Sequence, residues 1–327
     1  MLKTRVTELF GIEHPVLGGC MQWITGPDFT AAVSNAGALG IMSSAMFPTQ
    51  EGFREALRKL KELTARPFAV NLNLFPALRP MDNDLYVDAI LEEGGVGIVE
   101  TSGSRPPAAL LARLKEHGIV LMHKCTSVHH AVIAEEMGYD AVTVFGSEGG
   151  GHIGDAGLTF LSMVPRCVDL LKIPVIAAGG IADGRGLAAA LALGAQGALI
   201  GTRLLLSEES PIHDDLKRSM LEACETDTVT VLGTVHNNLR VWKNQAAEKA
   251  AELEAAGAPF EEIIKVVAGS LTRSMFETGD PDEGIIVCSQ DIGIIHEVKP
   301  VSEIVSGMVR EAERVADLLA AKDLTAK

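Results

Sequence analysis

Two glycine-rich segments are the parts of this 327-residue sequence best suited to binding an anion. Gly179-Gly180 and Gly201-Thr202 each follow a short run of Val, Ile, Leu and Ala, the composition of a strand buried on both faces. A turn without side chains lets backbone N–H groups approach a phosphate closely, so both segments predict a phosphate site. The competing interpretation is that these glycines only close tight turns.

Two basic side chains are the next candidates for chemistry. His152 follows three glycines on an open loop, where a histidine can bind or exchange protons near neutral pH. Lys124 ends an apolar run, and burying an unpaired ammonium there would be costly, so a phosphate or an electron-rich cofactor ring would suit it. The alternatives are that His152 only caps its loop and that Lys124 is an ordinary surface lysine.

The elements that must position these residues repeat along the first two-thirds of the chain. Helix-like segments separate eight apolar runs, which begin near Pro15, Leu39, Phe68, Gly97, Ile119, Asp140, Pro174 and Gly197. This alternation predicts an α/β fold, a TIM-like (β/α)8 barrel, in which chemistry is expected at the carboxyl ends of the strands. An open doubly wound sheet is the alternative, but its G-x-G-x-x-G fingerprint after the first strand is absent.

The pattern changes after the eighth run and predicts three regions. We expect the barrel to span residues 1–206 and a smaller, mostly helical domain to span residues 207–298, because strand and helix no longer alternate there. Apolar residues at helical spacing between Val301 and Ala321 predict a helix within residues 299–327 that packs back on the barrel, as its eighth helix.

Composition excludes several classes of partner. The chain has 28 Lys and Arg against 43 Asp and Glu, a net charge of −15, so nucleic acid is not an expected partner. No apolar run is long enough for a membrane span, and the first residues lack an apolar signal-peptide core, so we expect a cytoplasmic protein without a membrane partner. The five cysteines are odd in number and have no C-x-x-C spacing, which argues against a disulfide framework and a zinc site.

An ordered set of motifs resembles a known family. The segments are HPVLGGCMQW, FAVNLNLFP, HKC, EGGGHIGD and PVIAAGGIADGRGLAAALALGAQGALIGTR. Together they resemble the nitronate monooxygenase family, formerly called 2-nitropropane dioxygenase, which includes NADH:quinone reductases and flavin-dependent enoyl reductases. Each segment alone is a weak signal, but their order over about residues 10 to 215 is specific to the family.

The resemblance implies an FMN at the carboxyl end of the barrel. Matched position by position, it places the flavin ring beside Cys20, Met21, Gln22, Asn73, Lys124, Gly150 and Gly151, and the phosphate on Gly179, Gly180, Gly201 and Thr202. His152 matches the family's active-site histidine, and Pro76 matches a proline in a loop that gates the substrate pocket. This chain departs from the family where Gly18 replaces a glutamine, Cys20 a glycine and Phe145 an acidic residue.

The expected reaction is oxidation of an alkyl nitronate by O2 to a carbonyl compound and nitrite. One alternative keeps the FMN and uses NAD(P)H to reduce a quinone or an activated alkene. Another is a non-redox barrel that binds a phosphorylated metabolite, since fold analogy alone does not exclude it. Small molecules are the expected partners in each case, and a homodimer is left open.

Overall fold

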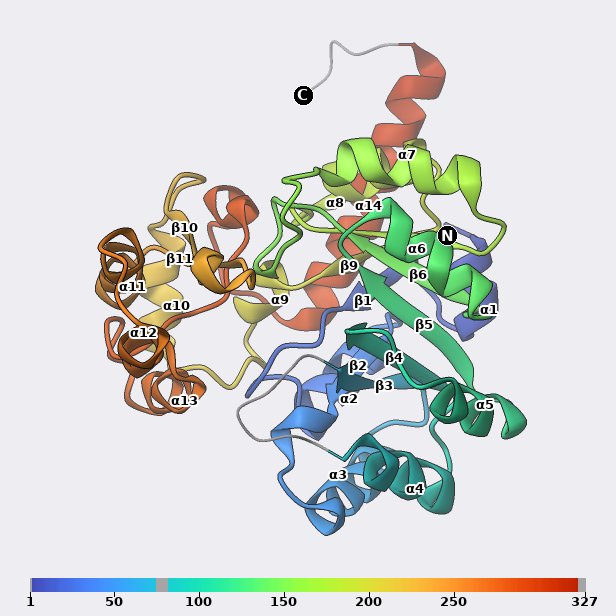
Figure 1. Ribbon diagram of the computed structural model, residues 1–327. Coiled ribbons are helices and arrows are strands. Elements are labelled where there is room, and N and C mark those ends of the chain that lie inside the picture. Colours follow the sequence, from blue (N-terminus) through green and yellow to red (C-terminus); the bar gives the residue numbers. More distant parts are fainter. Residues whose placement is uncertain (1, 75–81, 323–327) are drawn as a thin grey trace.

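The computed structural model describes residues 2–74 and 82–322, and its centre is an eight-stranded parallel sheet. The strands lie in the order β1-β9-β8-β6-β5-β4-β3-β2, and a bridge between Leu17 and Leu39 joins the first to the last. Their bounds are Val16–Gly18 (β1), Gly40–Ser43 (β2), Phe68–Leu74 (β3), Ile98–Gly103 (β4), Val120–Cys125 (β5), Ala141–Phe145 (β6), Val175–Ala178 (β8) and Gly197–Ile200 (β9). The predicted barrel is confirmed (Figure 1).

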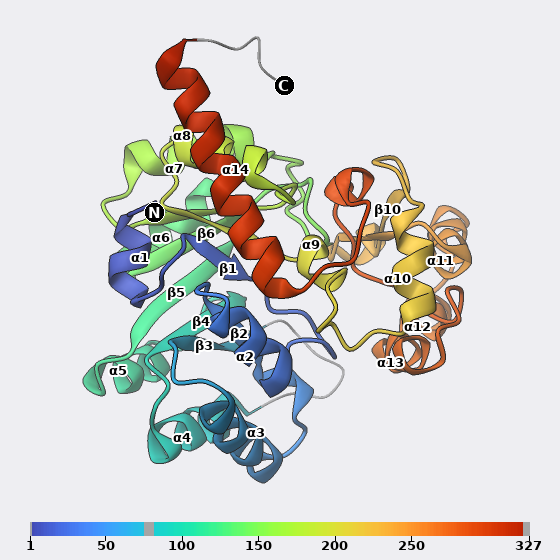
Figure 2. The same ribbon diagram turned by 180° about the vertical axis from the view of Figure 1, so that it is seen from behind.

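Eight helices surround the strands. They are α2 (Pro27–Asn35), α3 (Gln50–Leu63), α4 (Asn83–Glu93), α5 (Ala108–Glu116), α6 (Val128–Glu136), α7 (Phe160–Leu170), α8 (Gly184–Ala192) and α14 (Val301–Ala321). Figure 2 shows α14 lying across the back of the barrel beside α8, and it also contacts α2. Its buried residues include Val301, Val305 and Met308.

The core has two layers, because successive side chains of each strand point to opposite faces. Val70, Val99 and Val142 pack outward against the helices. An inner cluster fills the amino-terminal part of the barrel and includes Leu17, Ile41, Ala69, Ile98, Met122, Ile176 and Leu199, with Val6 and Phe10 of α1 (Arg5–Phe10) packed into it. Polar residues therefore lie beyond this apolar cluster, at the carboxyl ends of the strands.

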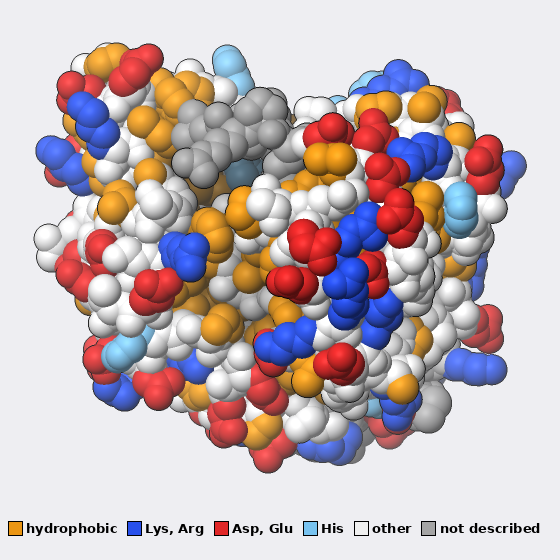
Figure 3. Space-filling model, turned by 90° about the horizontal axis from the view of Figure 1, so that it is seen from below, with side chains coloured by type: hydrophobic (Ala, Val, Ile, Leu, Met, Phe, Trp, Pro, Cys, Tyr) orange, Lys and Arg blue, Asp and Glu red, His pale blue; other side chains and the backbone are white. Residues whose placement is uncertain are grey.

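The surface over α3 and α4 mixes both signs of charge. Figure 3 shows basic and acidic side chains interspersed on the face seen from below. Ion pairs join α3 to its neighbours: Arg58 Nη2 lies 2.5 Å from Glu93 Oε1 of α4, and Lys59 Nζ lies 2.5 Å from Asp28 Oδ2 of α2. Within residues 2–74 and 82–322, no helix is both long and apolar enough to cross a bilayer.

A second, smaller region lies to one side of the barrel (Figure 1). It contains α10 (Asp214–Leu221), α11 (Gln245–Ala255), α12 (Phe260–Val267), α13 (Gly269–Thr278), β10 (Thr228–Val231) and β11 (Leu239–Trp242). The two short strands are absent from the sequence interpretation, because four-residue runs separated by a seven-residue loop give little periodicity. The boundaries at 206 and 298 stay predictions.

One strand of the small sheet comes from the barrel. β7 (Gly151–His152) lies in the loop after β6 and pairs antiparallel with β11, with His152 opposite Leu239. The residue after the predicted catalytic histidine is hydrogen bonded to the smaller region, because the backbone N–H of Ile153 donates to the carbonyl oxygen of Asn238 at 3.0 Å.

Candidate active site

A cavity of about 360 Å³ lies at the carboxyl ends of the barrel strands, in the size range of small-molecule sites. All twelve residues predicted for the site line it: Cys20, Met21, Gln22, Asn73, Lys124, Gly150, Gly151, His152, Gly179, Gly180, Gly201 and Thr202. Their convergence agrees with the prediction of one site, while the role of each stays a prediction. Pro76 lies outside the described residues.

Strand register explains why polar side chains gather on one side of the cavity. Ser43 on β2, Asn71 on β3 and Glu100 on β4 are aligned neighbours. Asn73 and Ser102 lie two residues further along β3 and β4, aligned with Lys124 on β5. Alternate residues of a strand share a face, so these side chains point into the barrel with Ile98 and Met122 of the inner cluster.

Glu100 is a residue of this cluster that sequence reasoning missed. Its side chain is 0% exposed, and its Oε2 lies 3.5 Å from Lys124 Nζ. Asn71 Nδ2 donates to the same Oε2 at 2.5 Å and to Ser102 Oγ at 3.2 Å. The available signal was an acidic residue inside the apolar run GIVETS, since an acid buried in a strand needs a partner.

The opposite side of the cavity presents backbone. Gly179 and Gly180 have φ of +95° and +69°, a region that favours glycine. Among the described residues, the N–H groups of Gly180, Gly201 and Thr202 have no hydrogen-bond acceptor. Such unpaired N–H groups converging on one cavity can bind an anion.

The hydroxyl of Thr202 has a separate role. Its Oγ1 accepts a hydrogen bond from the backbone N–H of Ser289 at 3.0 Å. Ser289 also lines the cavity. This bond ties the start of α9 (Thr202–Leu205) to the smaller region.

His152 is uncharged at neutral pH. Burial, with a smaller contribution from the positive charge of Lys124, lowers the pKa of His152 to about 4. The sequence argument assumed the ordinary histidine pKa near neutrality, so burial changes what the ring can do. It can donate or accept a hydrogen bond and move a proton, but it does not supply positive charge to a ligand.

The glycines before His152 permit close packing. A Cβ on Gly150 would lie 2.5 Å from the backbone carbon of Cys288, and Gly151 has φ of +105°. Both glycines therefore allow the loop to lie directly against the segment around residues 287–289.

The turn after β1 supplies Cys20, Met21 and Gln22. Burial raises the pKa of the Cys20 thiol above its ordinary value, so the thiol stays protonated at neutral pH. The backbone N–H of Met21 donates to Thr25 Oγ1 at 3.2 Å, which fixes the turn. Cys20 thus presents a neutral thiol to the cavity.

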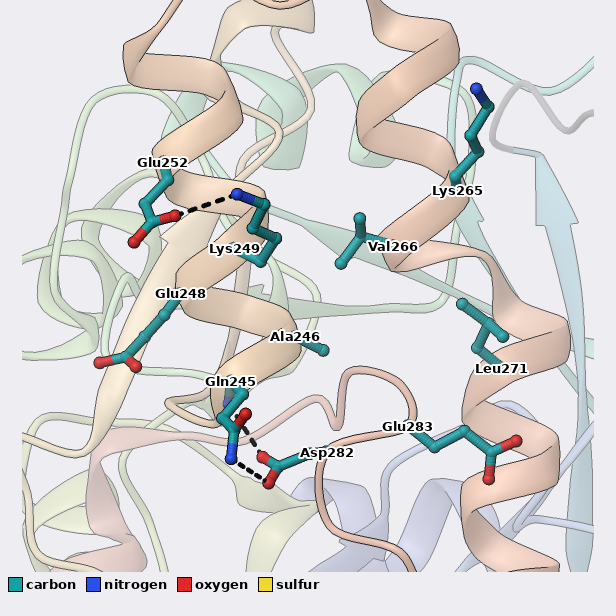
Figure 4. A pocket seen from close by; sticks show the side chains of 10 residues that line it. All are labelled: Gln245, Ala246, Glu248, Lys249, Glu252, Lys265, Val266, Leu271, Asp282 and Glu283. Atoms are coloured by element: carbon teal, nitrogen blue, oxygen red, sulfur yellow. Dashed lines mark hydrogen bonds and ion pairs between the residues drawn. The ribbon is translucent and has the colours of Figure 1, made fainter.

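A second hollow lies on the smaller region, between α11, α12, α13 and the segment around residues 282–283 (Figure 4). Gln245 bonds to Asp282, and Lys249 pairs with Glu252 at 3.3 Å. Four of its polar lining residues therefore pair with one another. The cavity in the barrel is the candidate active site.

The model of the family described as "Nitronate monooxygenase" matches residues 3–311 of this chain. The chain belongs to the nitronate monooxygenase family. It is therefore an oxidoreductase, and the family predicted from the ordered motifs is confirmed.

Relatives within the nitronate monooxygenase family carry different names. A Rhodococcus jostii protein named "(3aS,4S,5R,7aS)-5-hydroxy-7a-methyl-1-oxo-octahydro-1H-indene-4-carboxyl-CoA dehydrogenase" is 33% identical over 98% of both chains. A "Probable nitronate monooxygenase" of Staphylococcus saprophyticus is 35% identical over 70% of this chain and 75% of its own.

Two solved structures resemble the whole chain. FabK from Thermotoga maritima matches with a TM-score of 0.90 and 37% identity over 98% of this chain and 100% of that one. A nitroalkane oxidase from Streptomyces ansochromogenes matches with a TM-score of 0.81 and 24% identity over 96% and 99%, which shows the shared fold.

In this member of the nitronate monooxygenase family, the outer wall of the cavity is apolar. It comes mostly from the smaller region and includes Leu239, Val267, Phe276, Ile285, Ile286 and Val287. Sequence reasoning missed this wall, because no motif marks these residues and only folding brings them to the barrel. The wall gives the cavity room for an apolar part of a substrate.

Proposed function

We propose that this protein uses FMN and NAD(P)H to reduce a carbon–carbon double bond conjugated to a thioester carbonyl. The observation that carries the proposal is the distribution of charge in the cavity. Among the described lining residues, Lys124 and His152 are the ones that can carry positive charge, and Glu100 pairs with Lys124 while burial keeps His152 uncharged. An uncharged substrate with an apolar body fits this cavity better than a small anion does.

FMN fits the described residues. Unpaired N–H groups of Gly180, Gly201 and Thr202 would hold its phosphate. A Cβ added to Gly201 would make an ordinary contact with Met21 Sδ at 3.9 Å. Cys20, Met21, Gln22 and Asn73 would flank the ring. When bound, FMN supplies two-electron chemistry between a nicotinamide and the substrate.

The protein's own side chains would orient the substrate. His152 would donate its ring N–H to the thioester carbonyl oxygen and stabilise the negative charge that develops there when the β-carbon of the double bond accepts a hydride. The α-carbon would then take a proton, which completes the reduction. The apolar wall of Ile285, Ile286 and Val267 would hold the acyl part and exclude water. The full-length similarity to a protein whose name specifies a CoA thioester supports this substrate class.

Oxidation of an alkyl nitronate by O2 is the second candidate. It is favoured by the similarity to a "Probable nitronate monooxygenase" and by Lys124, the cation that lines the cavity floor. In this reaction His152 would bind the nitro group and Lys124 would stabilise negative charge.

Anaerobic spectroscopy of the FMN-loaded protein separates the candidates. NADH or NADPH should bleach the flavin absorbance, and crotonyl-CoA should then restore it. Propane-2-nitronate in place of the nicotinamide should leave the absorbance unchanged. The opposite pattern would establish the nitronate reaction, and a protein that retains no FMN after incubation would contradict both and favour the non-redox barrel.

A further inference from the structure

A buried ion pair lies in the barrel interior beside the cavity. Glu100 is 0% exposed and the Lys124 side chain is 19% exposed, with 3.5 Å between Oε2 and Nζ. Lys124 lines the cavity, so Glu100 stands behind it in the protein interior. Attraction in such a poorly solvated place is much stronger than at the surface.

The carboxylate of Glu100 is incompletely compensated. The contacts of Asn71 and Lys124 both reach Oε2. The other oxygen, Oε1, is buried and has no hydrogen-bond partner. A buried carboxylate with one oxygen unpaired keeps a negative field that extends to its surroundings.

Cys20 lines the cavity, and both charges of the ion pair act on the pKa of its thiol. After burial, the charges that act on its thiol are Lys124, which lowers the pKa, and Glu100, which raises it. The two charges therefore oppose each other at a residue that lines the cavity. A flavin in the cavity would experience the same opposition.

The geometry points to Glu100 as a residue that holds Lys124 in place and offsets its positive charge. With Glu100 present, a flavin bound in the cavity has a lower reduction potential, and is a stronger reductant, than it would be beside an unpaired Lys124. This inference rests on the proposed FMN. Reduction adds negative charge to the flavin, which a nearby cation stabilises and a nearby carboxylate opposes. A flavin kept strongly reducing passes a hydride to a substrate more readily, which deepens the proposed reductase function.

The experiment is a double-variant cycle on the FMN-loaded protein. The variants are Glu100→Gln, Lys124→Met and the combination of both, with Glu116→Gln on the exposed face of α5 as a matched control. The readouts are the midpoint potential of the bound flavin and its affinity for sulfite, which binds more tightly when negative charge on the ring is stabilised. Neither readout is turnover.

Glu100→Gln should raise the potential and tighten sulfite binding about tenfold, because the offsetting carboxylate is gone. Lys124→Met should shift both readouts in the opposite direction, and the double variant should lie close to the unmodified protein. A Glu100→Gln protein that matches Glu116→Gln in both readouts would overturn the inference. If Glu100→Gln does not fold, comparing Lys124→Met with the double variant isolates the same carboxylate, and equal values there would also overturn it.

A second measurement needs no flavin. In the apoprotein at constant pH, iodoacetamide should alkylate Cys20 faster in Glu100→Gln and more slowly in Lys124→Met, as followed by mass spectrometry of the Cys20 peptide. Equal rates in all variants would show that the pair does not act on the cavity. A protein that binds no FMN but shows the expected rates would contradict the proposed function and leave the ion-pair geometry standing.

Discussion

The two halves of the barrel rim present different chemistry to one cavity. Toward the carboxyl ends of β2 to β5, the inward-facing residues include the polar side chains of Asn71, Glu100 and Lys124. On β8 and β9 the strands end in Gly179, Gly180 and Gly201, and the cavity meets backbone. One half can tune charge, while the other can only offer N–H groups in fixed positions.

The difference shows how one fold divides two tasks. Backbone N–H groups suit a phosphate, whose charge does not change during the reaction. Polar side chains suit a ring whose charge changes during reaction, because each can be substituted without altering the strand. Changes to the glycine half should therefore affect binding, and changes to the polar half should affect reactivity.

The most severe test of the glycine half is Gly180→Asp. The new carboxylate would lie in the proposed phosphate site, and its Cβ would lie 3.1 Å from Glu148 Cβ at φ of +69°. We expect FMN affinity to fall by more than about a hundredfold, measured by fluorescence titration. Gly257→Asp is the control, since Gly257 has φ of +70° with open space around its Cβ, and it should bind FMN normally. Equal affinities in the two variants would remove Gly180 from the phosphate site.

His152→Ala removes a side chain that the loop after β6 contributes. We expect kcat for crotonyl-CoA to fall about a hundredfold while FMN stays bound, because the ring is proposed to touch the substrate and not the phosphate. His129→Ala on the exposed face of α6 is the control and should keep its activity. Unchanged turnover in His152→Ala would remove this histidine from the mechanism.

The dependence of kcat/KM on pH tests whether Lys124, in the polar half, acts on His152. With the pKa of His152 at about 4, its ring is uncharged from about pH 5.5 to 8, so this group should leave kcat/KM constant there and change it only as the pH falls toward 4. Lys124→Met removes a positive charge that lowers this pKa, so the acid limb of the profile should move to higher pH. A limb that stays in place would show that Lys124 does not act on His152.

The outer wall lies outside both halves, and Ile286→Ser tests it. Losing apolar contact should raise KM for crotonyl-CoA about tenfold and leave FMN affinity unchanged. Steady-state kinetics and fluorescence titration measure the two effects. A loss of FMN in this variant would assign the wall to the cofactor instead of the substrate.

The sequence predicted the parts of the site that local chemistry marks. Apolar runs between helix-ending glycines predicted the eight strands, and the segments Gly179-Gly180 and Gly201-Thr202 after two of them line the cavity. Glu100 was not predicted as a site residue, because its partners Asn71 and Lys124 belong to neighbouring strands and only the sheet register brings them together. Ile285 and Ile286 were not predicted to line the cavity, because the sequence does not indicate where an apolar pair so far from the barrel strands will pack.

The pairing of β7 with β11 connects the loop that carries His152 to the strand that contributes Leu239 to the apolar wall. His152 lies opposite Leu239 in the small sheet, the backbone N–H of the next residue, Ile153, donates to Asn238, and Leu239 belongs to the apolar wall. Any displacement of that sheet would carry the imidazole and the wall together. An acyl group that packs against the wall would thus also affect the position of the His152 ring. The shape of the substrate would then influence the hydrogen bond from His152 to the thioester carbonyl.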